Sequence, residues 1–543
     1  MERKSTNGRD QTVKQFAAFV MALAAASAVH GQAPSATSGT ALQTRPERTG
    51  FQETSRYDDV VAFLDALAKA SPAVHLTTFG KTSEGRSLPL AVIGAPDATP
   101  QAVRRTGKLR VYIQGNIHGG EVEGKESAQM LLRDLAQGKR AEWLQSMVLL
   151  IAPIYNADGN ERIALNNRGP QHGPMGGQGQ RPNAQGLDLN RDHMKLDSPE
   201  ARAVVQLMND YDPHVSLDLH TTNGTRHAYF LTYAPPLNPA TDPGIIGLLR
   251  KDWLPSVTRT IRAKYGWDYY YYGNLQGRSA APGAPDERSW RSFDHRPRFN
   301  NNYIGLRNRV AILSEAFAYA TFEDRIAATN RFVEAVLDYG HAHAAAIREV
   351  TEAADRTPLI GTRLSLQAEL ERAPGLVEIL LGEITEEKHP VDGHVMHRRA
   401  DVKKPERMAE YGTFKPTLTE RVPSAYYVPA ELTGALDRLR AHGIRMLPLA
   451  AAETVQVEEF QIQGNEVAAN EFQKHRERSL TGTWLGVERQ LPKGILKIDM
   501  TQPLARLAFY LVEPRSDDGL VNWNLLDAAL TGATVFPIVR TRR

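Results

Sequence analysis

The sequence predicts an α/β protein whose carboxyl-terminal part is rich in β-strands. Short β-branched runs at 111–117, 215–220 and 310–317 alternate with helical patterns in the first part of the chain. Beyond Ala353 the pattern changes to short alternating runs, with one expected helix at about 430–442. Alternating strands and helices indicate a sheet covered by helices, whereas a series of short strands indicates a separate β-rich domain.

The length of the chain predicts more than one folded domain. At 543 residues it exceeds what one ordinary hydrophobic core accommodates. We predict a signal peptide over 1–31, a flexible linker over 32–50, an α/β domain over 51–350 and a β-rich accessory domain over 355–543. The linker is inferred from its Ser, Thr, Gly, Gln and Pro content.

The amino terminus has the three parts of a secretory signal. Four basic side chains precede the apolar run 16–26, and small residues follow at 26–28 and 29–31. The run is too short to cross a bilayer comfortably as a mature helix. We therefore expect export to a periplasm or the exterior without stable membrane insertion, with an uncleaved anchor as the alternative.

Composition excludes several classes of function. The hydrophobic fraction is 41%, the charged fraction is 23% and the formal net charge is +3, values of a soluble globular protein rather than a nucleic-acid binder. The chain has no cysteine, so disulfides and cysteine-ligated zinc are excluded. Any metal site must use histidine and carboxylate ligands.

The first candidate metal ligands are His118 and Glu121, at the junction between strand 111–117 and a helix expected over 121–135. Imidazole nitrogen with carboxylate oxygen is a common zinc pairing, and hydrolytic zinc needs one further protein ligand and an open position. This spacing arises often by chance, so its meaning depends on residues farther along the chain.

His220 is the candidate third ligand. It ends the alternating run Val215–His220 and precedes a loop, so it is expected at the carboxyl end of a strand, where active sites collect in open α/β sheets. Asp218 points to the same strand face and could orient the imidazole. The alternative is that His220 only caps the strand.

Two further segments favour a hydrolase. Asn190 and Arg191 follow a short apolar stretch, and Glu315 stands near the end of the apolar strand 310–317. A lone glutamate in an apolar strand is costly unless it is paired or functional. The Gly/Pro/Gln-rich stretch 167–185 is expected as a long loop beside the site.

The order of these elements along the chain resembles that of the zinc carboxypeptidase family, whose members are similar to carboxypeptidase A. The chain most resembles the large exported bacterial members of this family. The resemblance covers about residues 51–345. It implies a mixed central sheet flanked by helices, and a catalytic domain over 51–350. The ordered elements are His118/Glu121, Asn156–Gly159, Asn190–Arg191, His220 and Glu315.

The resemblance implies that His118, Glu121 and His220 hold one Zn²⁺ per chain. Glu315 would act as the general base that takes a proton from the zinc-bound water. The implied enzyme is a zinc metallocarboxypeptidase, a metalloprotease that hydrolyses C-terminal residues from peptides. Two alternatives stay open: a zinc amidohydrolase or deacylase of small acyl-amino acids, and a catalytically silent peptide-binding protein.

The resemblance also implies the substrate-binding residues. Asn190 and Arg191 would hold the free C-terminal carboxylate of the peptide. Arg168 would polarise the scissile carbonyl, with Arg162 as the alternative. Tyr303 is the candidate for the family's mobile substrate-binding tyrosine, although it lies closer to Glu315 in sequence than the family pattern has it.

Overall fold

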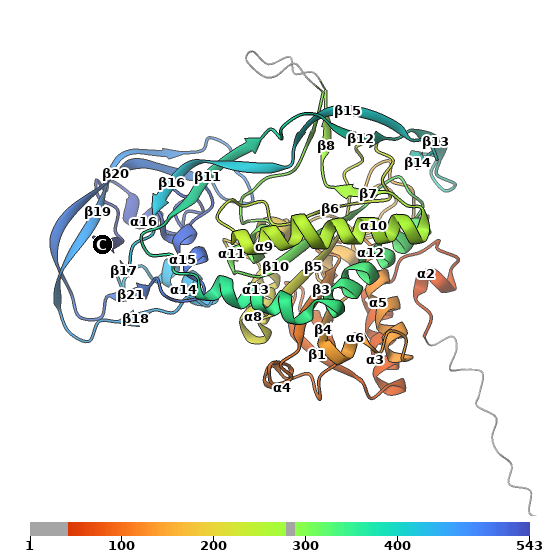
Figure 1. The fold of residues 1–543 in the computed structure, drawn as a ribbon, viewed down its shortest axis with the longest axis horizontal. Helices are drawn as coiled ribbons and strands as arrows, with labels where there is room; N and C mark the ends of the chain where they lie inside the picture. The colour runs from red at the N-terminus through yellow and green to blue at the C-terminus, as the bar shows by residue number, and fades with distance from the viewer. Residues whose placement is uncertain (1–41, 278–287, 543) are drawn as a thin grey trace, which may run out of the picture. The chain divides into compact units, whose positions relative to one another are not determined.

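The computed structural model describes residues 42–277 and 288–542 (Figure 1). The predicted signal peptide and most of the linker lie outside these residues. The described residues belong to one compact unit, and the domain boundary near residue 350 stays a prediction. Within the described part of the chain, no helix has both the length and the hydropathy that crossing a membrane requires.

A mixed eight-stranded sheet lies at the centre, as predicted. β3, β4, β5 and β10 run parallel to one another in adjacent pairs, as do β6 and β7, while β1, β2 and the β10–β6 pair are antiparallel. In spatial order the strands are β1 (Val74–Lys81), β2 (Ser87–Ile93), β4 (Met147–Ala152), β3 (Leu109–Gly115), β5 (Val215–Thr221), β10 (Val310–Ala316), β6 (Leu231–Ala234) and β7 (Tyr269–Tyr271).

Helices cover both faces of this sheet because its central strands are apolar on both sides. Val111 and Ile113 belong to one core and Tyr112, between them, to another. The longer helices are α3 (Tyr57–Ala70), α5 (Glu123–Ala136), α8 (Pro199–Tyr211), α10 (Leu254–Tyr265), α12 (Phe322–Ala342) and α13 (Ala344–Arg356). The core of Val111 includes α3, α5, α10 and α12. The core of Tyr112 includes α8 together with α11 (Asn300–Leu306) and α15 (Ala505–Val512), the last from the carboxyl-terminal part.

Short helices occupy the connections. The helices α12 and α13 are separated only by His343. The short segments are α2 (Arg45–Arg48), α4 (Pro100–Arg105), α6 (Trp143–Ser146), α7 (Ala157–Glu161), η1 (Leu189–Arg191), α9 (Pro243–Gly247), η2 (Leu248–Trp253) and α11 (Asn300–Leu306).

The part beyond residue 356 is rich in β-strands, as predicted. A six-stranded sheet has the order β18 (Leu447–Pro448), β21 (Leu496–Asp499), β17 (Ala425–Val428), β22 (Val539–Thr541), β19 (Glu453–Val467) and β20 (Arg478–Leu491). Two ribbons pair β11 (Arg363–Glu371) with β16 (Thr413–Arg421), and β13 (Ile384–Lys388) with β14 (Val395–Arg399). The helices are α14 (Thr433–Ala441), which was expected, and α15 (Ala505–Val512) and α16 (Asp527–Leu530).

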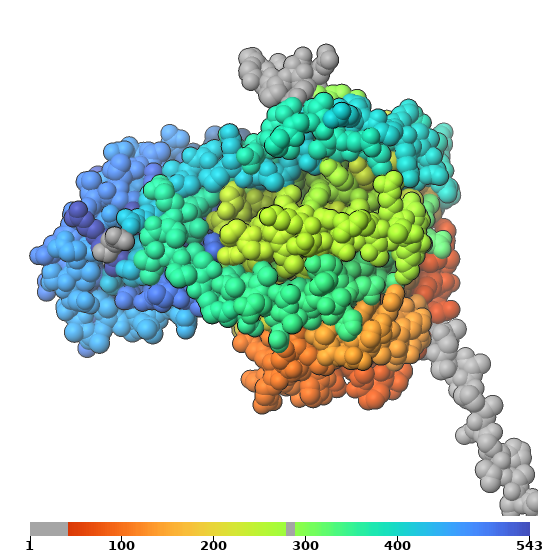
Figure 2. All heavy atoms as spheres, viewed as in Figure 1, coloured from red at the N-terminus to blue at the C-terminus, as the bar shows by residue number. Residues whose placement is uncertain are grey.

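One further sheet combines strands from both parts of the chain. β8 (Asn274–Gln276) and β9 (Ser289–Arg291) continue into β15 (Lys404–Tyr411) and β12 (Val377–Leu381). Figure 2 shows the teal surface of this later segment lying against the yellow-green surface of the α9–α10 region. There the Arg250 guanidinium donates to the carbonyl of Gly412 at 2.7 Å. The later segment is therefore packed directly onto the α/β part.

The parallel strands determine where the site forms. β3, β5 and β10 end at the same edge of the sheet, and Glu315 on β10 is the register partner of His220 on β5. His118 follows β3 by three residues. The three predicted functional segments therefore converge at one edge, as the strand pattern predicted.

Candidate functional site

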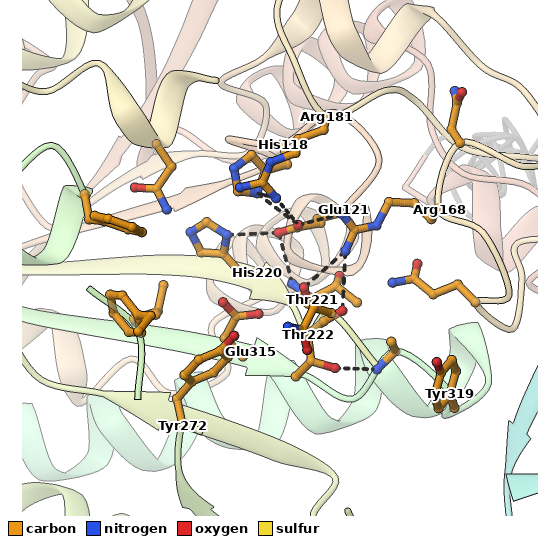
Figure 3. Close-up of a pocket in the computed structure, with 18 of the residues that line it drawn as sticks. His118, Glu121, Arg168, Arg181, His220, Thr221, Thr222, Tyr272, Glu315 and Tyr319 are labelled. Atoms are coloured by element: carbon orange, nitrogen blue, oxygen red, sulfur yellow. Dashed lines mark hydrogen bonds and ion pairs between the residues drawn. The ribbon is translucent and has the colours of Figure 1, made fainter. Parts of the chain in front are cut away.

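A pocket of about 430 Å³ opens at this edge of the sheet (Figure 3). Most of the predicted site residues line it, together with parts of the 167–185 loop, which lies beside the site as expected. The predicted residues in the lining are His118, Glu121, Arg168, Asn190, Arg191, His220 and Glu315.

The three predicted metal ligands lie together at the bottom of the pocket. Nδ1 of His118 is 2.9 Å from Oε1 of Glu121, and Nδ1 of His220 is 2.9 Å from Oε2 of the same carboxylate. The potential ligand atoms of the three residues all lie within 4.8 Å of one another. Each residue is at most 3% exposed. Two buried imidazoles and one carboxylate form a donor set that fits zinc.

A second carboxylate lies behind each histidine. Nε2 of His118 is 3.0 Å from Oδ1 of Asp188, and Nε2 of His220 is 2.9 Å from Oδ2 of Asp218. Gln114 donates to the other oxygen of Asp218 at 2.9 Å. A metal-binding histidine commonly has such a partner on its outer nitrogen, which leaves the inner nitrogen free to bind the ion. This arrangement supports the fit of the triad to a metal.

Close backbone packing shapes the turn that carries His118 and Glu121. A Cβ on Gly119 would lie 2.4 Å from the backbone carbon of Gly159, and one on Gly120 would lie 2.5 Å from the carbonyl oxygen of Gly179. Only glycine fits either position without moving the neighbouring backbone. The two glycines therefore allow the turn to pack against the 159–179 region.

The charges around Glu121 keep it ionised. Burial alone would raise its pKa, but His118 and Arg168 outweigh burial and hold the pKa well below its usual range. Nη1 of Arg168 lies 3.0 Å from Oε1 of Glu121. A charged carboxylate at this depth is suited to a cation.

Glu315 lies on β10, the strand next to β5, which carries His220. Its side chain lines the same pocket as the triad (Figure 3). Burial raises the pKa of its carboxyl group to about 8, against the opposing effect of His220. A carboxyl group with a pKa near neutrality is suited to proton transfer. Tyr272 lies beside Glu315 in the pocket wall, and burial together with that carboxylate raises the tyrosine pKa.

Asn190 and Arg191 lie on η1 at another wall. The Arg191 guanidinium donates to the carbonyl of Asn190 at 2.7 Å and is 3.8 Å from the ring centre of Phe299. Oδ1 of Asn190 accepts a hydrogen bond from the backbone of Asn300 at 2.8 Å. These contacts fix a cation and an amide side by side, a suitable arrangement for a carboxylate ligand.

The structure separates the two candidate arginines for the scissile carbonyl. Arg168 lies in the pocket beside Glu121, and its Nη2 donates to the carbonyl of Thr221 at 3.2 Å. The Arg162 side chain is 51% exposed and is paired with Glu84 outside the pocket lining. Its position in the pocket therefore favours Arg168 over Arg162 as the arginine for the scissile carbonyl.

Tyr303 is not in the pocket, so its assignment to the substrate-binding tyrosine is wrong in this structure. It belongs to α11 and is fully buried, with its hydroxyl 2.9 Å from Nδ1 of His442 and accepting from Arg307 at 3.2 Å. The packing of α11 therefore places Tyr303 in the core. Tyr272 and Tyr319 line the pocket instead.

Three residues of the site were missed in the sequence. Arg181 lies 2.8 Å from Asp188 and 3.7 Å from Glu121, between the two carboxylates. Asp188 precedes the recognised Asn190–Arg191 pair, so an acidic residue next to that pair was an available signal. Tyr272 ends a run of four tyrosines at 269–272, a pattern that by itself indicates a strand or a packed aromatic patch.

A second group with metal-binding side chains occurs in the turn between β13 and β14. It consists of His389, Asp392 and His394. The backbone of Val391 donates to Nδ1 of His389, and Asp392 accepts from both the backbone and the ring of His394. This group is partly exposed and lies outside the pocket, so we assign no metal to it.

Comparison with known families and relatives agrees with the geometry of the pocket. Residues 60–240 match a family described as zinc carboxypeptidase. Carboxypeptidase 2 of Trichophyton rubrum is 24% identical over 565 residues, which cover 98% of this chain and 94% of the relative. Carboxypeptidase 2 of Trichophyton tonsurans is 25% identical over 566 residues, covering 97% and 94%.

The chain is also similar to solved structures. A metallo-carboxypeptidase from Burkholderia cenocepacia is 18% identical, with a TM-score of 0.40 over 54% of this chain and 70% of its own.

Proposed function

We propose that this chain, whose residues 60–240 match the zinc carboxypeptidase family, is a zinc-dependent carboxypeptidase that removes C-terminal residues from peptides. One observation carries the proposal. The His118–Glu121–His220 group, Glu315 and Arg191 line a single pocket. A metal site, a proton-transfer group and a fixed cation are the three parts that hydrolysis next to a terminal carboxylate requires.

The triad is proposed to hold the ion through Nδ1 of His118, the carboxylate of Glu121 and Nδ1 of His220. When bound, zinc supplies a Lewis acid that polarises the substrate carbonyl and makes water more acidic. Asp188 and Asp218 keep the two imidazoles oriented through their outer nitrogens.

Glu315 is proposed to move the proton. Its carboxylate accepts a proton from the attacking water and passes it to the amine nitrogen of the departing residue. Burial raises its pKa to about 8 in the structure without a cation. A positive charge on the neighbouring triad favours the ionised form, which is the form a base needs.

Two sets of polar groups are proposed to position the peptide. Arg191 pairs with the terminal carboxylate, and Asn190 adds a neutral donor beside it. Arg168 donates to the scissile carbonyl oxygen as negative charge develops there. Arg168 already lies 3.0 Å from Glu121, so the carbonyl it contacts would lie next to the metal site.

Export is part of the proposal. The basic residues, apolar run and small residues of 1–31 support a cleaved secretory signal, which would place the enzyme in a periplasm or outside the cell. Amino-terminal sequencing of the mature protein tests this. A mature chain beginning near residue 32 is expected, and a retained residue 1 would contradict cleavage.

Product analysis of a peptide library by mass spectrometry tests the proposed reaction. We expect loss of single residues from free C termini, with the remainder of each peptide intact. Release of acyl groups from acyl-amino acids without peptide trimming would favour the deacylase alternative. Cleavage at internal bonds would contradict exopeptidase action.

Asp218→Asn tests the support behind His220. Asparagine has nearly the same shape but lacks the charge that orients the imidazole, so zinc affinity is expected to fall by about 10- to 100-fold. Chelator competition measures this change. The matched control is Asp65→Asn on the exposed side of α3, which should leave zinc affinity unchanged. Equal affinities in the two variants would contradict the role of Asp218.

A further inference from the structure

A side chain from the carboxyl-terminal part of the chain contacts Asp188, the carboxylate residue behind His118. Oε1 of Gln473 accepts a hydrogen bond from the backbone N–H of Asp188 at 2.9 Å. The two residues are 285 positions apart in sequence. Gln473 lies in the connection between β19 and β20, whereas Asp188 directly precedes η1, which carries Asn190 and Arg191.

Asp188 joins several parts of the proposed site. Its Oδ1 lies 3.0 Å from Nε2 of His118 and accepts from the backbone of Asn190 at 2.9 Å. Its Oδ2 accepts from Nε of Arg181 at 2.9 Å. A displacement of Asp188 would therefore move a proposed zinc ligand and the carboxylate-binding pair together.

The turn that presents Gln473 has an uncommon backbone conformation. Gln473 and Lys474 have φ angles of 50° and 66°. The flanking residues Phe472 and His475 exchange backbone hydrogen bonds of 2.7 and 3.0 Å, the pattern of a type I′ turn. Asn-Gly pairs are favoured in such turns because other residues are strained at positive φ. Gln-Lys occupies the turn here in spite of that strain.

Neighbouring contacts hold the strained turn against the α/β part. Nε2 of His475 lies 2.8 Å from Oδ2 of Asp197, and its Nδ1 lies 3.1 Å from Asn524. Two residues beyond it, Glu477 pairs with the buried Arg298 at 2.6 Å. Strained conformations persist where the surroundings determine them, and they are concentrated at functional sites.

We infer that Gln473 is a positioning residue, through which the carboxyl-terminal part fixes Asp188 and, through Asp188, the His118 imidazole and the Asn190–Arg191 pair. This inference rests on the proposed function. It gives the carboxyl-terminal part a direct role in the site: the α/β part supplies the reacting groups, and the β19–β20 turn fixes the loop that orients them.

Gln473→Ala in the full chain tests the inference. The substitution removes the acceptor and leaves the backbone N–H of Asp188 without it, so zinc affinity and kcat/KM on a free-acid peptide are each expected to fall by about two- to tenfold. Gln473→Glu keeps an acceptor oxygen at the same reach and should restore most of the loss. Lys474→Ala, at the exposed adjacent position of the same turn, should match the unaltered protein.

Zinc affinity is measured by chelator competition, which needs no turnover, and thermal unfolding is followed in parallel. Gln473→Ala with unchanged zinc affinity and unchanged kcat/KM would overturn the inference, whatever happens to its unfolding temperature. Equal losses in Gln473→Ala and Lys474→Ala would also overturn it, because the effect would then belong to the turn as a whole. An unaltered protein that binds zinc but trims no peptide would overturn the proposed function instead.

Discussion

Replacing Glu315 by glutamine is expected to leave zinc and peptide binding intact and to lower kcat by about a hundredfold to ten-thousandfold. The amide keeps the size of the side chain but cannot accept a proton from water. Steady-state kinetics, together with zinc content and the affinity for a non-cleaved peptide, measure the separation between binding and turnover. A variant with near-normal kcat would exclude Glu315 as the base.

Replacing His118 or His220 by alanine is expected to abolish peptide hydrolysis and to release the metal. Each substitution removes one of three proposed ligands, so zinc affinity should fall by more than the roughly 10- to 100-fold that loss of an outer partner costs. Metal analysis after dialysis measures occupancy, with one zinc per chain expected in the unaltered protein. His343→Ala, at an exposed histidine between α12 and α13, is the control.

Full zinc occupancy in His118→Ala and His220→Ala would show that the ligands are elsewhere. Chelation of the unaltered protein should likewise remove its activity, and added zinc should restore it.

The strands that build the site could be predicted because each is defined by the residue pattern within its own short segment. β3, β5 and β10 are short β-branched runs buried on both faces, and each ends close to a polar residue that would be costly in the core. Since parallel strands end at one edge, His118, His220 and Glu315 could be placed together without coordinates.

The position of Tyr303 in the structure could not be predicted from the sequence. Tyr303 was proposed from the family resemblance although it lies closer to Glu315 than the family pattern has it, and α11 carries it into the core, where its hydroxyl contacts His442. Tyr272, which directly follows the edge strand β7, reaches the pocket instead. The path of a long connection depends on how it packs against distant segments. The spacing of residues along the sequence carries no information about that packing.

The contacts that the carboxyl-terminal part makes with the α/β part could not be predicted for the same reason. Gln473 contacts Asp188 across 285 residues, and β9 pairs with β15 from the later region. Such contacts bring together segments that have no shared periodicity or motif. The β-rich character of this part could be predicted from its alternating runs, but its contact with Asp188 could not.

We propose that the enzyme recognises a free C-terminal carboxylate through Arg191. Comparing kcat/KM for one peptide as its free acid and as its C-terminal amide tests this most directly, in the unaltered protein and in Arg191→Ala. Amidation removes a charge-assisted pair worth about 1.5–3 kcal/mol, roughly a 10- to 150-fold loss. Arg191→Ala should lose a similar factor on the free acid and almost nothing further on the amide, whereas equal cleavage of both peptides by the unaltered protein would contradict carboxypeptidase action.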